Sequence, residues 1–388
     1  MASKYIVNTY GERPISLARG EGAYVWDAEG KKYLDLVAGI ATINVGHCNA
    51  RVVDALIAQA RQLIHVSNLY YIEPQAKLAK RLVELSFADK CFFCNSGAEA
   101  NEAAIKVARK YTKDKITKDK YEIITMFKSF HGRTMTTITA TGQEKYHKGF
   151  EPMAPGFKYV PFNDLKALED AVTDKTCAVM VEPIQAEGGI NMPDDDYLIK
   201  LRKLCDDKNL LLIFDEVQTA MGRLGTLFGY ESYGVEPDIM TMAKALGGGV
   251  PIGCMATKDH IAESLSPGTH ASTFGGNPLV CSAALASLNY IVDENLPDNA
   301  LKVGGYVMDK LKELMGKYPV IKEVRGKGLL IGMELKVEGK GFVMECMKEG
   351  LILNCIGSRI IRIAPPLIIS EKHVDEALPI MEKNLANL

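Results

Sequence analysis

Apolar positions alternate between helical and strand-like spacing along most of the chain. From about residue 50, apolar residues recurring every three or four positions predict helices at 50–63, 74–86, 97–111 and 195–207. Short, nearly continuous apolar runs between them predict buried strands at 90–94, 121–126, 178–182 and 210–214. This alternation is typical of an α/β fold built on a mostly parallel sheet.

The two ends of the chain follow a different pattern. Two apolar runs at 22–27 and 32–37 flank the polar turn at Glu29 and Gly30, which predicts a hairpin. After about residue 277 the pattern predicts helices and short strands, at 277–293, 299–317, 329–335, 351–354, 360–363 and from 371 onward. We therefore expect a large α/β domain over 50–275. A smaller α+β domain would combine the N-terminal segment 1–49 with residues 276–388.

Composition and charge exclude several classes of protein. Hydrophobic residues make up 47% and charged residues 24% of the 388 positions, which is typical of a globular protein and unlike a disordered one. The 46 basic and 48 acidic residues nearly cancel, so no nucleic acid or acidic membrane is an expected partner. Apolar runs such as 210–214 are far shorter than the roughly 18 residues of a membrane span.

The cysteines and the N-terminus indicate a reducing, cytoplasmic location. The first residues lack an apolar signal region, and the nine cysteines are scattered, as expected for free thiols. Cys91 and Cys94 form a CxxC motif, but Phe92 and Phe93 between them favour a buried strand. The alternative is a redox or metal pair, which no second CxxC or close histidine pair completes. We expect no metal site.

A helix start follows the predicted strand 90–94. Ser96, with Glu99 three residues later, has the spacing of a capping box. The small residues Gly97 and Ala98 leave the amide groups of the first turn unshielded. Such a turn binds a phosphate through backbone N–H groups and the helix dipole, although a capped helix with no ligand fits the same pattern.

Two charged residues stand in unusually apolar settings. Asp215 ends the predicted strand 210–214, at the edge where open α/β sheets bind their ligands. A metal, an arginine or a protonated heterocycle would each suit it, and so would a structural salt bridge. Lys244 lies 29 residues later, between Ala243 and Ala245, before a glycine run. Desolvation there would lower its pKa and free its amine as a nucleophile or base, whereas most lysines are solvated.

Together these three features match the needs of pyridoxal phosphate. That cofactor requires an anion site for its phosphate, a carboxylate for its pyridinium nitrogen and a lysine for its aldehyde. The sequence contains no GxGxxG after a strand, no GxxxxGK[ST] and no GxSxG motif.

The same residues lie in segments that resemble the class III (subgroup II) pyridoxal-phosphate aminotransferases of fold type I. Within that family, the acetylornithine group is the most similar. The resemblance covers nearly the whole chain through nine segments in family order, at 20–47, 95–111 (NSGAEANEAAIKVARKY), 130–134 (FHGRT), 181–189 (VEPIQAEGG), 214–225 (FDEVQTAMGRLG), 243–253 (AKALGGGVPIG), 269–278 (THASTFGGNP), 324–335 and 362–369.

The resemblance implies roles for the residues around the cofactor ring. Lys244 would form the Schiff base with the aldehyde and then move the proton. Asp215 would bind the pyridinium nitrogen, and Gln218 would hydrogen-bond the 3-oxygen of the ring. Phe130 would stack on the ring, and Val217 would also contact the cofactor.

The resemblance also implies a phosphate site shared between two subunits. Ser96, Gly97 and Ala98 would bind the phosphate from their own chain. Thr273 would reach it from the other subunit of a homodimer, and the neighbouring Ser272 would touch the substrate.

Four further residues would select the substrate. Arg133 would hold the distal carboxylate of 2-oxoglutarate or the carboxylate of the amino donor. Arg362 would bind the α-carboxylate of glutamate bidentately. Glu187 would cover Arg362 when the ω-amino substrate is bound and release it for glutamate. Tyr10 would line the substrate carboxylate site.

The implied reaction transfers the terminal amino group of N2-acetyl-L-ornithine to 2-oxoglutarate, giving N-acetyl-L-glutamate 5-semialdehyde and L-glutamate in arginine biosynthesis. Ile40 stands where ornithine aminotransferases usually carry tyrosine, which argues against free ornithine; Ala186 replaces the common glycine. Other donors remain open: 4-aminobutyrate, succinylornithine, N-succinyl-diaminopimelate and ornithine. A non-catalytic relative is a further alternative, against which the intact Lys244, Asp215, Gln218 and Arg133 argue.

Overall fold

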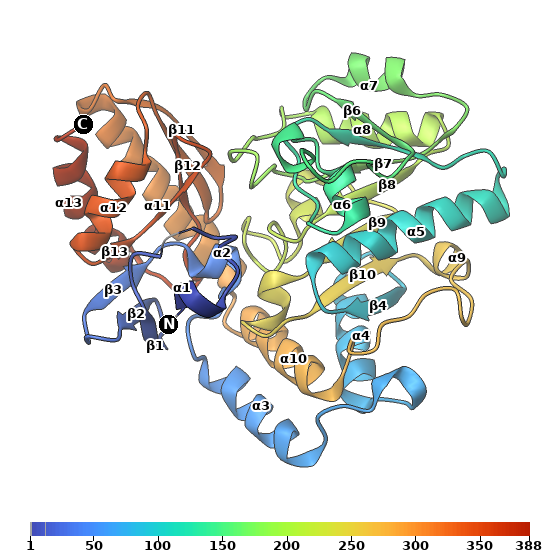
Figure 1. Cartoon of the computed structure of the whole chain (residues 1–388), viewed down its shortest axis with the longest axis horizontal. Helices are drawn as coiled ribbons and strands as arrows, with labels where there is room; N and C mark the ends of the chain where they lie inside the picture. The colour runs from blue at the N-terminus through green and yellow to red at the C-terminus, as the bar shows by residue number, and fades with distance from the viewer. Residues whose placement is uncertain (1, 12) are drawn as a thin grey trace.

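The computed structural model describes residues 2–11 and 13–388, which are organised around three sheets. One sheet has seven strands and two have four. Figure 1 shows the seven-stranded sheet with its helices on one side of the molecule, and the N-terminal strands together with the C-terminal elements on the other.

The seven-stranded sheet confirms the α/β prediction. Its spatial order is β4 (Lys90–Cys94), β10 (Gly253–Thr257), β9 (Ile239–Met242), β8 (Leu211–Asp215), β7 (Thr176–Val181), β5 (Glu122–Met126) and β6 (Phe157–Val160). Only β10 runs antiparallel to its neighbours; every other pairing is parallel. All residues of β7, β8 and β9 are buried, because helices cover both faces of a parallel sheet.

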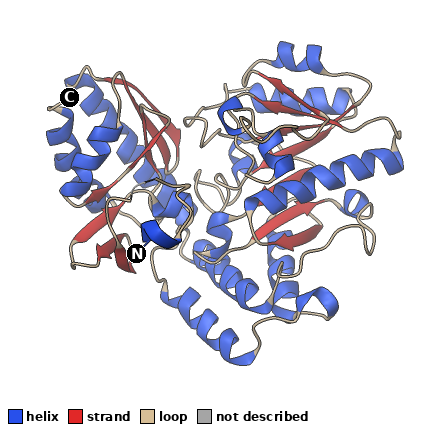
Figure 2. Cartoon of the chain, in the orientation of Figure 1, coloured by secondary structure: helices blue, strands red, loops and turns tan. Residues whose placement is uncertain are grey.

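The helices lie around this sheet, as Figure 2 shows. Helix α5 (Gly97–Lys115) packs on β4, β9 and β10, and α8 (Tyr197–Asp207) packs on β8 and on α7 (Leu165–Ala171). Helix α10 (Pro278–Asp293) packs against α3 (Ala50–Gln62) and α4 (Glu73–Leu85). Shorter helices are α1 (Ala2–Tyr5), α2 (Ala38–Ala41), α6 (Met135–Ala140) and α9 (Asp259–Ala262).

Two small sheets bring the chain ends together. The first contains β1 (Leu17–Glu21), β2 (Tyr24–Asp27), β3 (Lys32–Asp35) and β13 (Leu351–Ile352), which pairs in parallel with β3. The second, called the C-terminal sheet here, has the order β11 (Ile321–Lys327), β12 (Leu330–Leu335), β15 (Ile360–Ile363) and β14 (Asn354–Ile356). The helices of this region are α11 (Leu296–Lys317), α12 (Lys340–Lys348) and α13 (Glu371–Leu385).

Two predicted elements have different bounds in the structure in a way that changes the fold description. The expected strand 351–354 is two strands, β13 and β14, which belong to different sheets. The helix predicted at 97–111 extends four residues further, to Lys115. Thr112 is fully buried there and its hydroxyl donates to the carbonyl of Ala108 at 2.7 Å, while Lys110 and Asp114 form an ion pair at 2.6 Å. The ion pair stabilises the last turn of the helix in this charged segment.

The cysteine prediction agrees with the structure. Cys91 and Cys94 lie in β4, and burial raises the pKa of the Cys94 thiol to about 12. All nine cysteines are free. Within residues 2–11 and 13–388, no group of three or more His, Cys, Asp or Glu side chains is placed to hold a metal ion.

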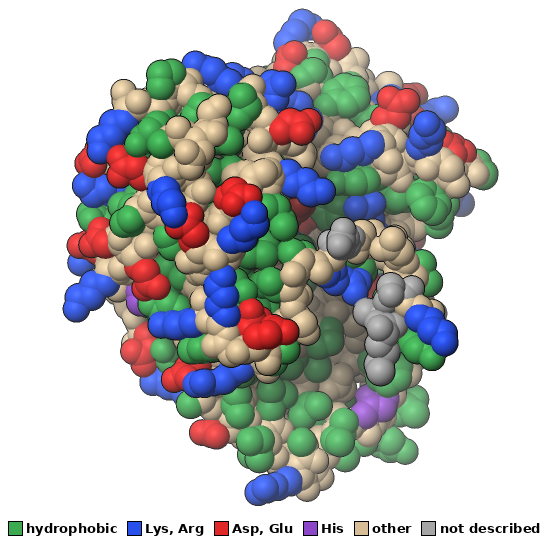
Figure 3. Space-filling model, turned by 60° about the vertical axis from the view of Figure 1, so that its left-hand side comes forward, with side chains coloured by type: hydrophobic (Ala, Val, Ile, Leu, Met, Phe, Trp, Pro, Cys, Tyr) green, Lys and Arg blue, Asp and Glu red, His purple; other side chains and the backbone are tan. Residues whose placement is uncertain are grey.

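The surface carries charges of both signs. Figure 3 shows lysines and arginines interspersed with aspartates and glutamates over the face it presents, in keeping with the formal net charge of −2. No helix in the part of the chain that the structure describes is long and apolar enough to cross a membrane.

Candidate active site

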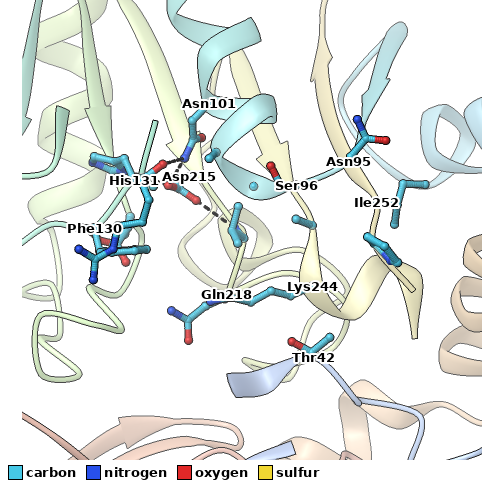
Figure 4. A pocket seen from close by; sticks show the side chains of 18 of the residues that line it. Thr42, Asn95, Ser96, Asn101, Phe130, His131, Asp215, Gln218, Lys244 and Ile252 are labelled. Carbon is cyan, nitrogen blue, oxygen red and sulfur yellow. Dashed lines mark hydrogen bonds and ion pairs between the residues drawn. The ribbon is translucent and has the colours of Figure 1, made fainter. Parts of the chain in front are cut away.

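A cavity of about 520 Å³ opens at the carboxyl ends of β8 and β9, beside the start of α5. Parallel sheets bind their ligands at this edge. Nine residues singled out from the sequence line it together: Ser96, Gly97, Ala98, Phe130, Arg133, Asp215, Val217, Gln218 and Lys244. Figure 4 shows Asp215 close to Asn101 and His131, with Ser96 on another wall and Lys244 between Gln218 and Thr42.

The start of α5 forms one wall of the cavity. Ser96 caps the helix, since its Oγ accepts from the Glu99 N–H at 3.2 Å. The reciprocal half of the expected capping box differs, because Glu99 accepts from the backbone N–H of Asn95 at 2.6 Å. A Cβ on Gly97 would lie 2.9 Å from Cγ2 of Val217, so only glycine allows this close approach. The exposed amides and the helix dipole suit an anion.

Asp215 is held by three hydrogen bonds. Its Oδ2 accepts from Nδ2 of Asn101 at 2.7 Å and from Nδ1 of His131 at 2.8 Å, and its Oδ1 accepts from the Val217 N–H at 3.1 Å. The residue is only 4% exposed, yet it lines the cavity. These three donors fix the orientation of the carboxylate at the cavity wall.

Asn101 and His131 were missed by the sequence analysis. Both lie inside motifs that were recognised, NSGAEAN and FHGRT, but spacing along the chain does not reveal that they converge on one carboxylate. Nε2 of His131 is buried and has no hydrogen-bond partner among the described residues.

Lys244 begins the short 3-10 helix η4 (Lys244–Gly247), separated from the end of β9 by one residue. Its φ of +42° lies in the left-handed region, which is strained for a residue with a side chain and is often retained at functional sites. No hydrogen bond or ion pair with another described residue involves its Nζ. Desolvation lowers the pKa of Lys244 to about 8, although the negative charge of Glu187 opposes this shift. The amine is therefore available as a nucleophile near neutral pH.

This lowered pKa predicts a pH dependence of amine reactivity. In the cofactor-free protein, the acetylation rate of Lys244 by acetic anhydride should rise with pH and reach half its maximum near pH 8. The reason is that only the neutral amine reacts, and its fraction grows as pH passes the pKa. Mass spectrometry of the Lys244 peptide measures the rate. Exposed Lys166, whose pKa is raised above 10.5 by Asp170, is the internal control. Parallel profiles for both lysines would contradict the prediction.

Phe130 and Arg133 form an aromatic and basic wall of the cavity, and Figure 4 shows Phe130 beside His131. The ring of Phe130 meets that of Tyr146 edge-on, with centroids 5.9 Å apart. The guanidinium of Arg133 lies 4.0 Å from the Tyr146 centroid and 5.5 Å from that of Phe130. Arg133 lines the cavity, and its charge can therefore receive a carboxylate there.

Arg362 and Glu187 are paired beside Gln218. The side chain of Arg362 is 1% exposed, and its Nη1 donates to Oε1 of both Glu187 and Gln218. Nε2 of Gln218 donates to Glu187 at 3.1 Å. Burial raises the pKa of Glu187, but the positive charges of Arg362 and Lys244 outweigh it and the net pKa is lowered. Glu187 is thus an ionised partner that neutralises Arg362.

Glu182 is a further cavity residue that the sequence analysis did not single out. Its two carboxyl oxygens accept from the backbone N–H groups of Phe130 at 2.9 Å and Ala186 at 3.1 Å. Burial, and then the charge of Asp215, raise its pKa well above the ordinary value. Glu182 therefore ties the wall that carries Phe130 to the loop that carries Glu187.

Five predicted residues do not line this cavity within one chain. Two of them, Glu187 and Arg362, lie directly behind Gln218 of its wall. Ser272 and Thr273 line a neighbouring cavity of about 540 Å³, where Oγ of Ser272 accepts from Nδ2 of Asn95 at 3.2 Å. Tyr10 is 81% exposed in the N-terminal segment.

Comparison with known proteins identifies the family. The family model for class-III aminotransferases matches residues 5–385. The chain belongs to the class-III aminotransferases. It is 54% identical to the acetylornithine aminotransferase of Methanocaldococcus jannaschii, over 99% of this chain and 96% of that protein. It is 52% identical to the acetylornithine aminotransferase of Caldanaerobacter subterraneus subsp. tengcongensis, over 99% of this chain and 98% of that protein.

Solved structures of aminotransferases share the fold. The ornithine aminotransferase of Toxoplasma gondii superposes with a TM-score of 0.96 at 35% identity, covering 100% of this chain and 93% of that one. The acetylornithine aminotransferase of Elizabethkingia anophelis superposes with a TM-score of 0.90 at 34% identity, covering 100% of this chain and 97% of that one. The resemblance, the fold type I architecture and the enzyme class predicted from the sequence are thus confirmed.

This aminotransferase depends on pyridoxal phosphate, and its cavity fits that cofactor. The amides at the start of α5 suit the phosphate, the carboxylate of Asp215 suits a protonated ring nitrogen, and Nζ of Lys244 lacks a protein partner among the described residues. When bound, pyridoxal phosphate supplies an aldehyde for an amine and a protonated ring that accepts electrons.

Proposed function

We propose that this aminotransferase moves the terminal amino group of N2-acetyl-L-ornithine to 2-oxoglutarate, producing N-acetyl-L-glutamate 5-semialdehyde and L-glutamate for arginine biosynthesis. The pairing of Glu187 with Arg362 carries the proposal. With Arg362 neutralised, the site favours an amine whose reacting end bears no α-carboxylate. When Glu187 turns away, Arg362 can bind the α-carboxylate of glutamate.

Lys244 and Asp215 would perform the chemistry. Nζ of Lys244 would give up its place to the substrate amine, then take a proton from the carbon that bears this amine and deliver it to the cofactor. Asp215, fixed by Asn101 and His131, would hold the ring nitrogen protonated. Ser96, Gly97 and Ala98 would bind the phosphate, while Val217 and Gln218 would contact the ring.

Substrate selection would rest on the basic wall and on the cavity rim. Arg133 would hold the distal carboxylate of 2-oxoglutarate. Ile40, which is 46% exposed in α2, lies two residues from Thr42 of the cavity wall. An isoleucine offers no hydrogen bond to a free α-amino group, which favours an acylated donor over ornithine. The similarity to acetylornithine aminotransferases over 99% of the chain supports the same donor.

A homodimer is part of this proposal. Thr273 lies outside the cavity of its own chain, which is the placement expected if it completes a neighbour's phosphate site. Several large apolar side chains are exposed on one chain and would be covered by a second copy, among them Leu69, Tyr70, Tyr71 and Phe274. The roles of Ser272 and Tyr10, the domain boundaries and the cytoplasmic location stay predictions.

A panel of amino donors tests the function. The absorption of the cofactor-loaded protein is followed after mixing with N-acetylornithine, ornithine, 4-aminobutyrate, succinylornithine or N-succinyl-diaminopimelate. The kcat/KM for bleaching of the band by N-acetylornithine should be at least about tenfold higher than that for ornithine or 4-aminobutyrate. A single substrate group that fits its pocket typically changes kcat/KM by about this factor. Addition of 2-oxoglutarate should restore the band. Faster reaction with another amine would change the donor only, whereas no band with added cofactor would overturn the enzyme assignment.

A further inference from the structure

The loop that carries Glu187 spans residues 184–191 and connects two parts of the molecule; we call it the Glu187 loop. Its base is closed by reciprocal backbone hydrogen bonds of 3.1 Å between Gln185 and Asn191. Nε2 of Gln185 donates to the carbonyl of Phe127 at 3.0 Å, which fixes the base to the region of the seven-stranded sheet. The tip of the loop reaches the C-terminal sheet, whose strands β11 and β12 face the large sheet in Figure 1.

Three residues of the C-terminal sheet form one cross-strand row beneath this tip. Arg325 on β11 pairs with Gly332 on β12, and Gly332 pairs with Arg362 on β15. Directly opposed residues of neighbouring antiparallel strands point to the same face of a sheet. The two arginines therefore flank a glycine, and the row continues from Arg362 to Asn354 on β14. Arg362 binds Glu187.

Arg325, on the edge strand β11, binds the backbone of the Glu187 loop. Its Nη2 donates to the carbonyl of Gly189 at 2.7 Å, and its Nε donates to the carbonyl of Ile190 at 3.1 Å. Its Nη1 donates to Glu323 and Glu334, both at 2.7 Å. The side chain is 13% exposed, so these contacts are largely shielded from solvent.

Gly332, in the centre, makes room for the loop. A Cβ at this position would lie 3.1 Å from both Cβ and Cγ1 of Ile190, tighter than an ordinary contact. Ile190 is fully buried and has a φ of +55°, a strained conformation that its surroundings must hold in place. The row thus contacts the loop at three points. Arg362 binds the Glu187 side chain, Gly332 packs against the Ile190 side chain, and Arg325 binds the backbone carbonyls of Gly189 and Ile190.

We propose that Arg325 and Gly332 are positioning residues that set the preference of the enzyme between its two amine substrates. They dock the Glu187 loop so that the Glu187 carboxylate meets Arg362, and only this side chain has to turn when glutamate arrives. This inference rests on the proposed function, in which Arg362 exchanges Glu187 for the α-carboxylate of glutamate. A loosened loop leaves Arg362 more open to α-carboxylates and weakens the ω-amine half of the reaction.

The test compares the two half-reactions in Arg325→Gln and Gly332→Ala. Single-turnover absorption changes give kcat/KM for N-acetylornithine and for L-glutamate with each cofactor-loaded protein. The ratio of the first to the second should fall by about 3- to 30-fold in both variants, the range found for residues that couple to a site without touching its ligand. Arg325→Lys, which retains the charge, should restore part of the ratio.

Lys322→Gln is the matched control. Lys322 binds the same Glu334 at 2.6 Å but makes no hydrogen bond to the loop among the described residues, so its loss should leave the ratio unchanged. Equal losses in both half-reactions, or an unchanged ratio in folded Arg325→Gln and Gly332→Ala proteins, would overturn the inference. If one variant does not fold, the other decides.

Failure of the proposed function has a different signature. Wild-type protein that does not react with N-acetylornithine would contradict the donor. The ratio is then measured with the ω-amine that the donor panel identifies, and the same fall is expected. The two proposals therefore succeed or fail separately.

Discussion

Replacing Lys244 with alanine should lower kcat by at least about 10⁴-fold, the upper range for one positioned general base, while the fold is retained. The amine would serve twice, as the attachment point of the cofactor and as the group that moves the proton. Nζ of Lys244 has no hydrogen-bond partner among the described residues, so its removal leaves no buried group newly unpaired. The backbone keeps its positive φ, because alanine meets the same strain there as lysine.

Steady-state turnover, the absorption of the loaded protein and the thermal unfolding midpoint measure this outcome. The absorption band that depends on lysine should disappear, and the midpoint in the absence of cofactor should stay close to that of the wild type. Lys166→Ala is the control, since this exposed lysine forms an ion pair with Asp170 on its own helix and lies outside the cavity lining. A Lys244→Ala protein with more than about a tenth of wild-type activity would refute the catalytic role, since loss of one general base removes far more.

Replacing Asp215 with asparagine should lower kcat by about 10²–10³-fold, as expected when one preorganised electrostatic group is lost. The side chain keeps its shape but loses the negative charge that would hold the ring nitrogen protonated. Its amide also meets donors on both sides, because Oδ2 accepts from Asn101 and His131 and Oδ1 accepts from the Val217 N–H. The new amide N–H group of the asparagine must then face one of these N–H donors, which removes a hydrogen bond that orients the side chain.

Activity at saturating pyridoxal phosphate, together with the dissociation constant of the cofactor, separates these two effects. Asp215→Asn should lose activity even when fully loaded. Asp207→Asn, which removes an exposed carboxylate paired with Lys203 at the end of α8, is the control. Near-wild-type kcat in the loaded Asp215→Asn protein would mean that the charge is not required.

The residues proposed for the chemistry could be predicted from the sequence, because each lies in a recognisable local pattern. The apolar run before Asp215 predicts a buried strand, and its end places the carboxylate at the ligand-binding edge of a parallel sheet. Ser96 and Gly97 predict a capped helix start directly after another strand. Lys244 stands out because its neighbours are apolar. Periodicity and capping depend on neighbours in the chain, so they can be read without a structure.

Tertiary structure decided which of these groups meet. Asp215 receives hydrogen bonds from residues 114 and 84 positions away, Asn101 and His131, and Arg362 pairs with Glu187 across 175 positions. Hydrophobic pattern reports whether a position is buried but not which partner it faces. The same limit hid the division of 351–354 between two sheets.

The row of Arg325, Gly332 and Arg362 shows this division most clearly. The sequence by itself indicated the α/β class, the cofactor and nine of the residues at the cavity, because periodicity, caps and motifs are local. Strand register alone decided that a glycine lies between two arginines under the Glu187 loop. Register depends on pairing between distant segments, and a shift of one residue would turn each of these side chains to the other face.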